Sequence, residues 1–421
     1  MLKKQIISAI GPGLLFAAVS VGVSHLVQST RAGAVYGLAM LVFIFYGLIT
    51  KYPASRFGQQ YAVATGTTLL EGFRKQGLWS LILMAMITTS AMFTGLAAVT
   101  LVTAGIAKAS FGLSLSPVII SAFILVAGML LLTIGQFHWL DITIKILVVI
   151  MACSTLVATS FAIPNINWEL SATLLPEKFD ILTIMFIVGL VGWMPAPLDT
   201  AILQSIWTVA KAHDSERKID WSIASLDFHI GYLGAAFLAV CFLLLGTAVM
   251  HGSGVQLESS AGGFATQLIS LYQETLGDWS KPVIAISALA VMLSTVLTLL
   301  DGYPRAIAIL FLRFQYAEDP DIKDDDKAMK PAYLTSMVVL ITGALIIQFF
   351  FSNSFRTLIA VATTISFITA PIVAWLIHKA MNSAEVPMQQ RPGPGLRLYS
   401  LICIYLLAGF ALFYLYLFST T

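Results

Sequence analysis

Charged residues are scarce in this chain of 421 amino acids. Asp, Glu, Lys and Arg make up 10% of it, while 58% of the residues are hydrophobic. A soluble globular domain carries roughly 25% charged residues, and the mean hydropathy of this chain is +0.89. So much apolar surface excludes a water-soluble fold. The net charge of +2 gives no sign of nucleic-acid binding, and we expect no nucleic-acid partner.

Cysteine and catalytic motifs are also rare or missing. Cys153, Cys241 and Cys403 stand inside apolar runs without the spacing of metal ligands, so we interpret them as packing residues. The sequence has no Walker loop, no GxSxG motif and no His-Glu-x-x-His motif. We therefore expect neither an enzyme nor a bound cofactor. Without an ATP motif, any uphill transport would be driven by an ion gradient.

Apolar runs of about 20 residues, by contrast, recur along the whole chain, and each is long enough to cross a hydrocarbon core of about 30 Å. None shows the alternating polarity of a barrel strand. The runs predict an all-α polytopic membrane protein, a single transmembrane domain over residues 1–421 with a first helix that is retained rather than cleaved. About eleven spans are predicted, near residues 9–29, 35–55, 79–107, 117–135, 139–163, 180–206, 223–250, 282–312, 332–352, 356–378 and 397–418.

Lysine and arginine are distributed unevenly between the two sides of these spans. Most of them, such as Lys3, Lys4, Arg74 and Lys75, fall on the same side as the N-terminus. The opposite side receives only Arg31, Lys108, Lys178, Lys281 and Arg356. By the positive-inside rule the N-terminus is predicted to be cytoplasmic. The short loops favour a bacterial plasma membrane.

Two spans carry helix-breaking residues near their middles. The first contains Gly22, Ser24 and His25, and the sixth contains Pro195 and Pro197. Backbone groups freed inside a membrane must pair within the protein or line a wet cavity, and paired breaks of this kind mark the binding site of inverted-repeat transporters. The alternative is that Gly22 serves close helix packing and that Pro195 only kinks its helix.

Because the broken spans are the first and the sixth, each opens a set of five. The sequence therefore predicts a five-plus-five inverted repeat. Repeat one covers about 9–163, repeat two about 180–378, and an extra helix covers about 397–418.

These residues resemble the natural resistance-associated macrophage protein (Nramp) family of divalent-metal transporters, which has the LeuT-type fold. The resemblance rests on GPG at Gly11–Gly13, Ala-Gly-Ala at Ala32–Ala34, Met194–Pro195 and the segment around Phe137–Asp141. It covers nearly the whole chain. The resemblance implies a transporter with a site between spans one and six.

The departures from the family fall on its chemistry. The Asp-Pro-Gly-Asn that binds metal in the family is replaced by the residues Gly22 to His25. The span-three carboxylates of the proton route fall on Thr89 and Met92, and the histidine of Met-Pro-His becomes Ala196. The resemblance therefore implies a divergent branch that lacks most of the family's metal-binding residues and the carboxylates of its proton route.

Six residues are candidates for substrate binding: Gly22, Ser24, His25, Met194, Asp199 and Thr363. An ionisable group inside a membrane is costly and is by default a functional hypothesis. His25 would ligate a metal, donate to an anion or carry a proton, or else be a structural histidine; we expect it to face the central cavity. Asp199 would replace the lost carboxylate, pair with His25 across the cavity, or cap the second half-helix.

The other candidates rest on the resemblance. Met194 matches the family's metal-binding methionine, a soft ligand, so that His25 and Met194 form the candidate metal site. Thr363 matches a polar residue of helix ten, although a hydroxyl there also bonds back to its own helix. Lys51 is interpreted as snorkelling at the end of span two.

Two further charged pairs are interpreted as structural. Asp141 with Lys145, and Asp301 with Arg305, are each four residues apart on one helical face, a spacing that lets opposite charges neutralise each other.

The sequence thus predicts an Nramp-like secondary transporter of a small solute, nominally a metal cation, that uses alternating access. H⁺ or Na⁺ would be the coupling ion, and lipid the surrounding partner. Two alternatives stay open at this point: a LeuT-type symporter of an organic solute or anion, and a non-transporting sensor built on a transporter scaffold. The sequence does not define an oligomeric state.

Overall fold

The computed structural model describes residues 11–420, apart from residues 172, 174, 215–219, 253–257, 259–262, 264, 268, 271–272, 274–276, 316–328 and 352–353. Lys3, Lys4 and the first two residues of the first predicted span lie outside the described residues. The described part of the chain contains helices and no strands, as the apolar runs predict.

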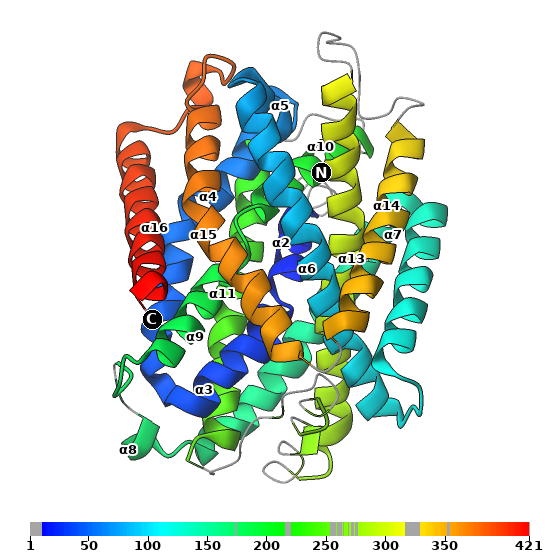
Figure 1. Cartoon of the computed structure of the whole chain (residues 1–421), viewed down its shortest axis with the longest axis vertical. Coiled ribbons are helices and arrows are strands. Elements are labelled where there is room, and N and C mark those ends of the chain that lie inside the picture. The colour runs from blue at the N-terminus through cyan, green and yellow to red at the C-terminus, as the bar shows by residue number, and fades with distance from the viewer. Residues whose placement is uncertain are drawn as a thin grey trace.

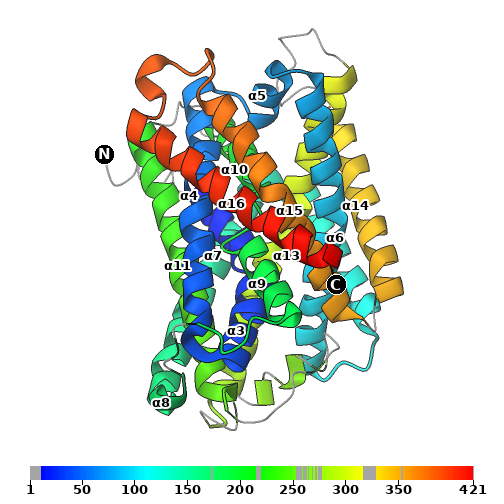
Figure 2. The ribbon, with the colours of Figure 1, turned by 60° about the vertical axis from the view of Figure 1, so that its left-hand side comes forward.

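The helices of the first half are α2 (Pro12–Ser20), the π-helix η1 (Ser24–Ser29), α3 (Thr30–Tyr36), the 3-10 turn η2 (Gly37–Met40), α4 (Leu41–Thr65), α5 (Leu69–Lys75), α6 (Leu78–Phe111), α7 (Pro117–Ala162), η3 (Ile163–Asn165) and α8 (Trp168–Ser171). Those of the second half are α9 (Ile181–Trp193), α10 (Thr200–Asp214), α11 (Trp221–Met250), α13 (Ser280–Gln315), α14 (Met329–Phe351), α15 (Phe355–Met381), η4 (Met388–Gln390) and α16 (Pro394–Thr420). The helix α2 lies in the middle of the bundle, and α14 and α16 lie at its edges (Figures 1 and 2).

The number of spans agrees with the prediction. Nine stretches of the described residues are long and apolar enough to cross a membrane, and α7 contains two of them, Pro117–Gly135 and His138–Asn165. One of the nine, Ser24–Thr65, runs from the second half of the interrupted span one through all of span two, and the interrupted span six is not among the nine. Counting span one (α2–α3) separately from span two (α4), and adding span six (α9–α10), gives eleven.

The interruption of span one lies between Ser20 and Ser24. The amide of Gly22 bonds to the carbonyl of Ser20 at 3.0 Å instead of reaching Ala18, as a regular α-helix requires. The hydroxyl of Thr295, on α13, supplies the missing donor and lies 2.7 Å from the Ala18 carbonyl oxygen. The predicted break is therefore present, and a neighbouring helix satisfies the carbonyl that it frees.

The interruption of span six lies between Trp193 and Thr200. Pro195 and Pro197 have no amide hydrogen, so neither residue can donate to the carbonyl four positions earlier. The peptide bond between Met194 and Pro195 is cis. This predicted break is also present.

Charged contacts tie the ends of several spans together on one side of the molecule. Arg313 lies 2.9 Å from Glu71 of α5, and Lys75 lies 2.7 Å from Glu385, in the connection between α15 and α16. This end carries α5, while α8 lies at the opposite end (Figure 1). Lys75 and Arg313 thus lie at the same end of the bundle.

Candidate functional site

A small cavity lies between the two interrupted spans. Its volume is about 30 Å³, where one water molecule needs roughly 10–15 Å³ on the same measure. It is lined by Val19, Val23, Ser24, Ala91, Thr94, Gly95, Val99, Trp193, Pro197, Thr200, Thr295, Leu299, Tyr303, Ala362 and Ser366. The lining residues come from α2, η1, α6, α13 and α15 and from both sides of the break in span six. The cavity therefore has room for a small ion or a few water-sized groups.

The break in span one forms one wall of the cavity. Ser24 Oγ lies 2.5 Å from the Ser20 carbonyl oxygen and 2.8 Å from Nδ1 of His25. Beside it, Thr295 Oγ1 lies 2.7 Å from the Ala18 carbonyl oxygen and 3.2 Å from that of Val21. Hydroxyl and carbonyl oxygens therefore lie in this wall, next to the apolar side chains of Val19 and Val23.

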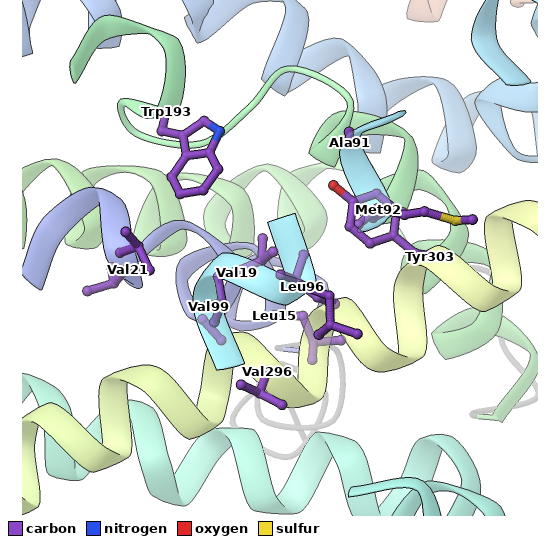
Figure 3. Packing of buried hydrophobic residues seen from close by; sticks show 14 of the residues in the cluster. Leu15, Val19, Val21, Ala91, Met92, Leu96, Val99, Trp193, Val296 and Tyr303 are labelled. Carbon is purple, nitrogen blue, oxygen red and sulfur yellow. The ribbon is translucent and has the colours of Figure 1, made fainter. Parts of the chain in front are cut away.

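The break in span six forms the facing wall. The indole nitrogen of Trp193 donates to Ser366 Oγ at 3.0 Å, which ties the end of α9 to α15. Thr200 Oγ1 donates to the Pro197 carbonyl at 2.5 Å and so begins α10. In the view of Figure 3, Trp193 and Tyr303 lie on either side of Val19.

A buried carboxylate stands directly behind the lining residue Tyr303. The phenol of Tyr303 donates to Asp199 Oδ2 at 3.0 Å, and Asp199 is 5% exposed. A hydroxyl that donates to a carboxylate becomes a better electron-pair donor through its own oxygen. The negative charge of Asp199 therefore makes the Tyr303 oxygen, which lines the cavity, a better electron-pair donor.

The polar groups that line the cavity are neutral and stand among apolar side chains. Besides the indole of Trp193 they are the hydroxyls of Ser24, Thr94, Thr200, Thr295, Tyr303 and Ser366, and no charged side chain of the described residues lines the cavity. Within the described ranges, no group of three or more His, Cys, Asp or Glu side chains is placed to hold a metal ion. Hydroxyl and carbonyl oxygens suit hard cations rather than soft ones.

Three of the predicted substrate residues lie at the cavity or next to it. Ser24 lines it. Gly22 lies in the break and allows Thr295 to approach, because a Cβ on Gly22 would lie 2.6 Å from Thr295 Oγ1. Asp199 stands one hydrogen bond away, behind Tyr303. The structure therefore brings these three residues together.

His25 does not face the cavity, so our expectation for the direction of its side chain is wrong. Its ring is fully buried, and Nε2 donates to the carbonyl of Ala235 on α11 at 2.9 Å, while Nδ1 lies beside Ser24. This position is that of a histidine that joins span one to span seven. A direct role of His25 as a metal ligand stays a prediction, which this geometry does not favour.

Met194 and Thr363 are also buried away from the cavity lining. Met194 belongs to an apolar cluster with Phe16, Ile44 and Val191. The hydroxyl of Thr363 donates to the Ile359 carbonyl of its own helix at 2.8 Å. The structure does not place Met194 and Thr363 with Ser24, and it is Ser366, one turn after Thr363, that lines the cavity.

Lys51 differs most from its predicted position. The sequence predicts that it snorkels to a membrane surface, but its side chain is fully buried. Nζ donates to the carbonyls of Val191, Gly192 and Ala196 at 2.7, 2.7 and 3.1 Å. The prediction is wrong because buried carbonyls at the break offer the ammonium better partners than the membrane surface does.

The two charged pairs on single helices are confirmed. Lys145 lies 2.8 Å from Asp141, and Arg305 lies 2.8 Å from Asp301. Asp301 also accepts hydrogen bonds from Trp207 and Tyr333, both at 3.0 Å. These pairs lie outside the cavity lining.

Sequence reasoning missed several lining residues. Thr94 and Thr295 are hydroxyl residues within apolar spans, Trp193 directly precedes the Met194–Pro195 pair, and Tyr303 stands between Asp301 and Arg305. The position of Trp193 beside a break was a usable signal. For the other three, the sequence alone does not indicate which side of the helix faces the cavity.

Comparison with known proteins identifies the relatives of this chain. The family described as "Natural resistance-associated macrophage protein-like" matches residues 13–417. An uncharacterised protein of Pasteurella multocida is 31% identical over 373 residues, which cover 88% of this chain and 84% of that protein.

Solved structures show the same fold at low identity. The Eremococcus coleocola manganese transporter, in complex with an aromatic bis-isothiourea compound, superposes with a TM-score of 0.75 at 13% identity, covering 98% of this chain and 87% of that one. MhsT in complex with L-phenylalanine superposes with a TM-score of 0.67 at 13% identity, covering 96% and 97%. The all-helical bundle with interrupted spans one and six is therefore the LeuT-type five-plus-five fold. With the family match over nearly the whole chain, the protein is a membrane transporter of the Nramp-like family and not an enzyme.

Proposed function

We propose that this transporter carries a small, hard metal cation by alternating access through the cavity between its two interrupted spans. The observation that carries the proposal is the hydrogen bond of 3.0 Å from Tyr303, which lines the cavity, to the buried carboxylate of Asp199. A cation that binds the Tyr303 oxygen would be stabilised by the charge behind it. The manganese named for the Eremococcus coleocola transporter is the substrate of that protein, and it supports a cation here only through the shared family.

The size and the charge of the cavity argue against the two other substrate classes. A volume of about 30 Å³ is far below the several hundred Å³ typical of sites for organic ligands. An anion is bound most strongly by cationic side chains, and among the described residues no Lys, Arg or His lines the cavity. A small cation needs only oxygen ligands.

The lining also predicts which cations would bind. Met194, a thioether that suits soft transition metals, is buried in an apolar cluster and not in the cavity lining. A single carboxylate, which acts through a hydroxyl, compensates a divalent charge less well than a direct carboxylate ligand. We therefore propose hard cations such as Na⁺, Mg²⁺ or Mn²⁺, with weaker binding of divalent ions than a directly coordinating aspartate would give.

For the membrane placement, we propose a cytoplasmic N-terminus in a bacterial plasma membrane. The proposal rests on the basic residues of α5 and of the ends of α13 and α15, which share one end of the bundle. Cysteine labelling from each side of intact cells, at Lys75→Cys and at Lys178→Cys, tests it. Labelling of Lys75→Cys from outside would contradict it.

Ligand-dependent thermal stability tests the substrate class. A ligand that binds only the folded state raises the apparent stability with its concentration. We expect Na⁺, Mg²⁺ or Mn²⁺, and not L-amino acids or phosphate, to raise the melting temperature of the purified protein. The Asp199→Asn variant should lose this response, while the control Asp278→Asn, a change at an exposed carboxylate, should keep it. A response to an amino acid or to phosphate alone would contradict the proposal.

A further inference from the structure

The side chain of Lys51 ends at the interruption of span six. Lys51 lies within α4, is fully buried, and places Nζ 2.7 Å from the carbonyl oxygens of Val191 and Gly192 and 3.1 Å from that of Ala196. A buried ammonium inside a membrane is costly unless it is paired. The three hydrogen bonds to carbonyl oxygens therefore offset the cost of burying the ammonium.

The three contacts match the hydrogen-bonding capacity of a lysine ammonium. A carbonyl oxygen only accepts hydrogen bonds, so each contact uses an N–H of the lysine. An ammonium has three such donors and a neutral amine has two. The geometry therefore suits the ammonium form of Lys51, with every donor used.

Two of the three carbonyls, those of Val191 and Gly192, belong to the end of α9, and that of Ala196 lies in the break that follows. In a continuous helix the amide of residue 195 would donate to the Val191 carbonyl, but Pro195 has no amide hydrogen. The last carbonyls of α9 also form the negative end of its helix dipole. Without Lys51, these oxygens would converge inside the membrane with no cation among them.

The packing of α4 brings the ammonium to this point. Gly47, one turn before Lys51, lies so close to the break that a Cβ at this position would be 2.9 Å from the Met194 carbonyl oxygen. Residues four apart share one face of a helix. The face of α4 that carries Gly47 and Lys51 therefore lies against the end of α9.

A buried carboxylate, that of Asp199, belongs to the same break, three residues after Ala196. Lys51 and Asp199 thus place one positive and one negative charge beside the same break, with Tyr303 between the carboxylate and the cavity. Convergent carbonyls with a nearby carboxylate are what a free metal cation binds.

We propose that the carbonyls of Val191, Gly192 and Ala196 form a monovalent-cation site at the interrupted span six, and that the chain fills this site with its own lysine ammonium. Lys51 is thus a tethered cation and a positioning residue for the break. A free Na⁺ has no place at this end of α9. Any ion that couples to transport must bind elsewhere.

Removal of the side chain tests whether the site accepts a free cation. Lys51→Ala leaves space beside the three carbonyls, whereas Lys51→Met fills it with an uncharged chain of similar length. We expect both variants to melt below the wild type. Methylammonium or Na⁺ should then raise the melting temperature of Lys51→Ala in a saturable manner, without such a response from Lys51→Met. The matched control, Lys281→Ala, changes an exposed lysine and should behave as the wild type.

A second measurement separates positioning from simple packing. Once a transported cation is known, its flux through Lys51→Ala should depend on added methylammonium, while wild-type flux should not change with it. The melting-temperature experiment needs no transported substrate, so it stands even if the proposed function fails. Three results would each overturn the tethered-cation site: a wild-type melting temperature for Lys51→Ala, equal responses of the Ala and Met variants, or failure of Lys51→Ala to fold both with and without methylammonium.

Discussion

The hydroxyl of Thr295 lies where a side chain on Gly22 would have to go: a Cβ built on Gly22 would be 2.6 Å from Thr295 Oγ1. The same hydroxyl donates to the Ala18 carbonyl, which the break in span one leaves without a helical partner. The role of Gly22 is therefore less to make the chain flexible than to leave room for Thr295 of α13. In that space Thr295 donates a hydrogen bond to the Ala18 carbonyl, which the break leaves without a helical partner.

The first prediction concerns Gly22→Ala. The added methyl group must displace Thr295 and weaken its bond to Ala18, and overpacking of this kind costs about 1–3 kcal/mol. We expect a lower melting temperature than that of the wild type. Gly409→Ala in α16 is the matched control, because no atom lies within 4 Å of its built Cβ. Equal melting temperatures for Gly22→Ala and Gly409→Ala would show that the close approach does not matter.

The second prediction concerns Asp227, a buried residue of α11. Its carboxylate accepts bonds from the amides of Gly11 and Gly13 at 3.2 and 2.7 Å and from Gln59 at 3.2 Å, so it caps the start of α2. Asp227→Asn turns one acceptor into a donor and leaves a buried amide unsatisfied, at a cost of about 1–3 kcal/mol. We expect faster hydrogen exchange in α2 as well as a lower melting temperature.

The control for this prediction is Asp220→Asn. Asp220 caps the exposed start of α11 through Ser222, at 2.7 Å, and does not touch α2. Exchange in α2 should stay at the wild-type rate in this variant. If Asp227→Asn left the exchange of α2 unchanged, the capping role would be refuted.

The third prediction concerns His25→Ala. The ring joins span one to the carbonyl of Ala235 at 2.9 Å and does not line the cavity. Its loss removes a buried hydrogen bond and leaves the Ala235 carbonyl without this donor, which costs about 1–3 kcal/mol. We expect a lower melting temperature with unchanged cation flux per folded molecule. A selective loss of flux at normal stability would restore a direct role for His25 in transport.

The interruptions were predictable because their causes are local. Pro195 and Pro197 lack amide hydrogens wherever they stand in a helix, and Gly22 marks a position without a side chain. The all-helical fold and the number of spans were predictable for a similar reason, since apolar length alone decides whether a helix can cross the membrane. The positions of the two breaks, in spans one and six, predicted the inverted repeat, and the fold shared with the solved transporters agrees with it.

The cavity lining was not predictable to the same degree, because it depends on the rotation of each helix. Successive residues of a helix point roughly 100° apart, so Ser24 faces the cavity while His25 faces α11. Lys51 escaped prediction because hydropathy does not show that three carbonyls at a distant break need a cation.

The fourth prediction concerns Tyr303→Phe. This change removes the hydroxyl that joins the cavity to Asp199 and keeps the ring. Loss of a group behind a metal ligand typically costs about 10- to 100-fold in affinity, and this change removes the proposed ligand oxygen together with its link to Asp199. We expect cation affinity to fall by at least that factor in equilibrium binding. Tyr333→Phe, at a tyrosine bonded to Asp301 outside the cavity, is the matched control and should bind as the wild type does.

Uptake of labelled Na⁺, Mg²⁺ and Mn²⁺ into proteoliposomes tests the proposed cation transport most directly. The wild type should show saturable uptake of at least one of these cations. Asp199→Asn should lose this uptake although its orientation in the membrane is unchanged. The control Asp278→Asn should retain the uptake. Uptake of an amino acid or an anion in place of every cation, or full cation uptake by Asp199→Asn, would contradict a cation site built on Tyr303 and Asp199.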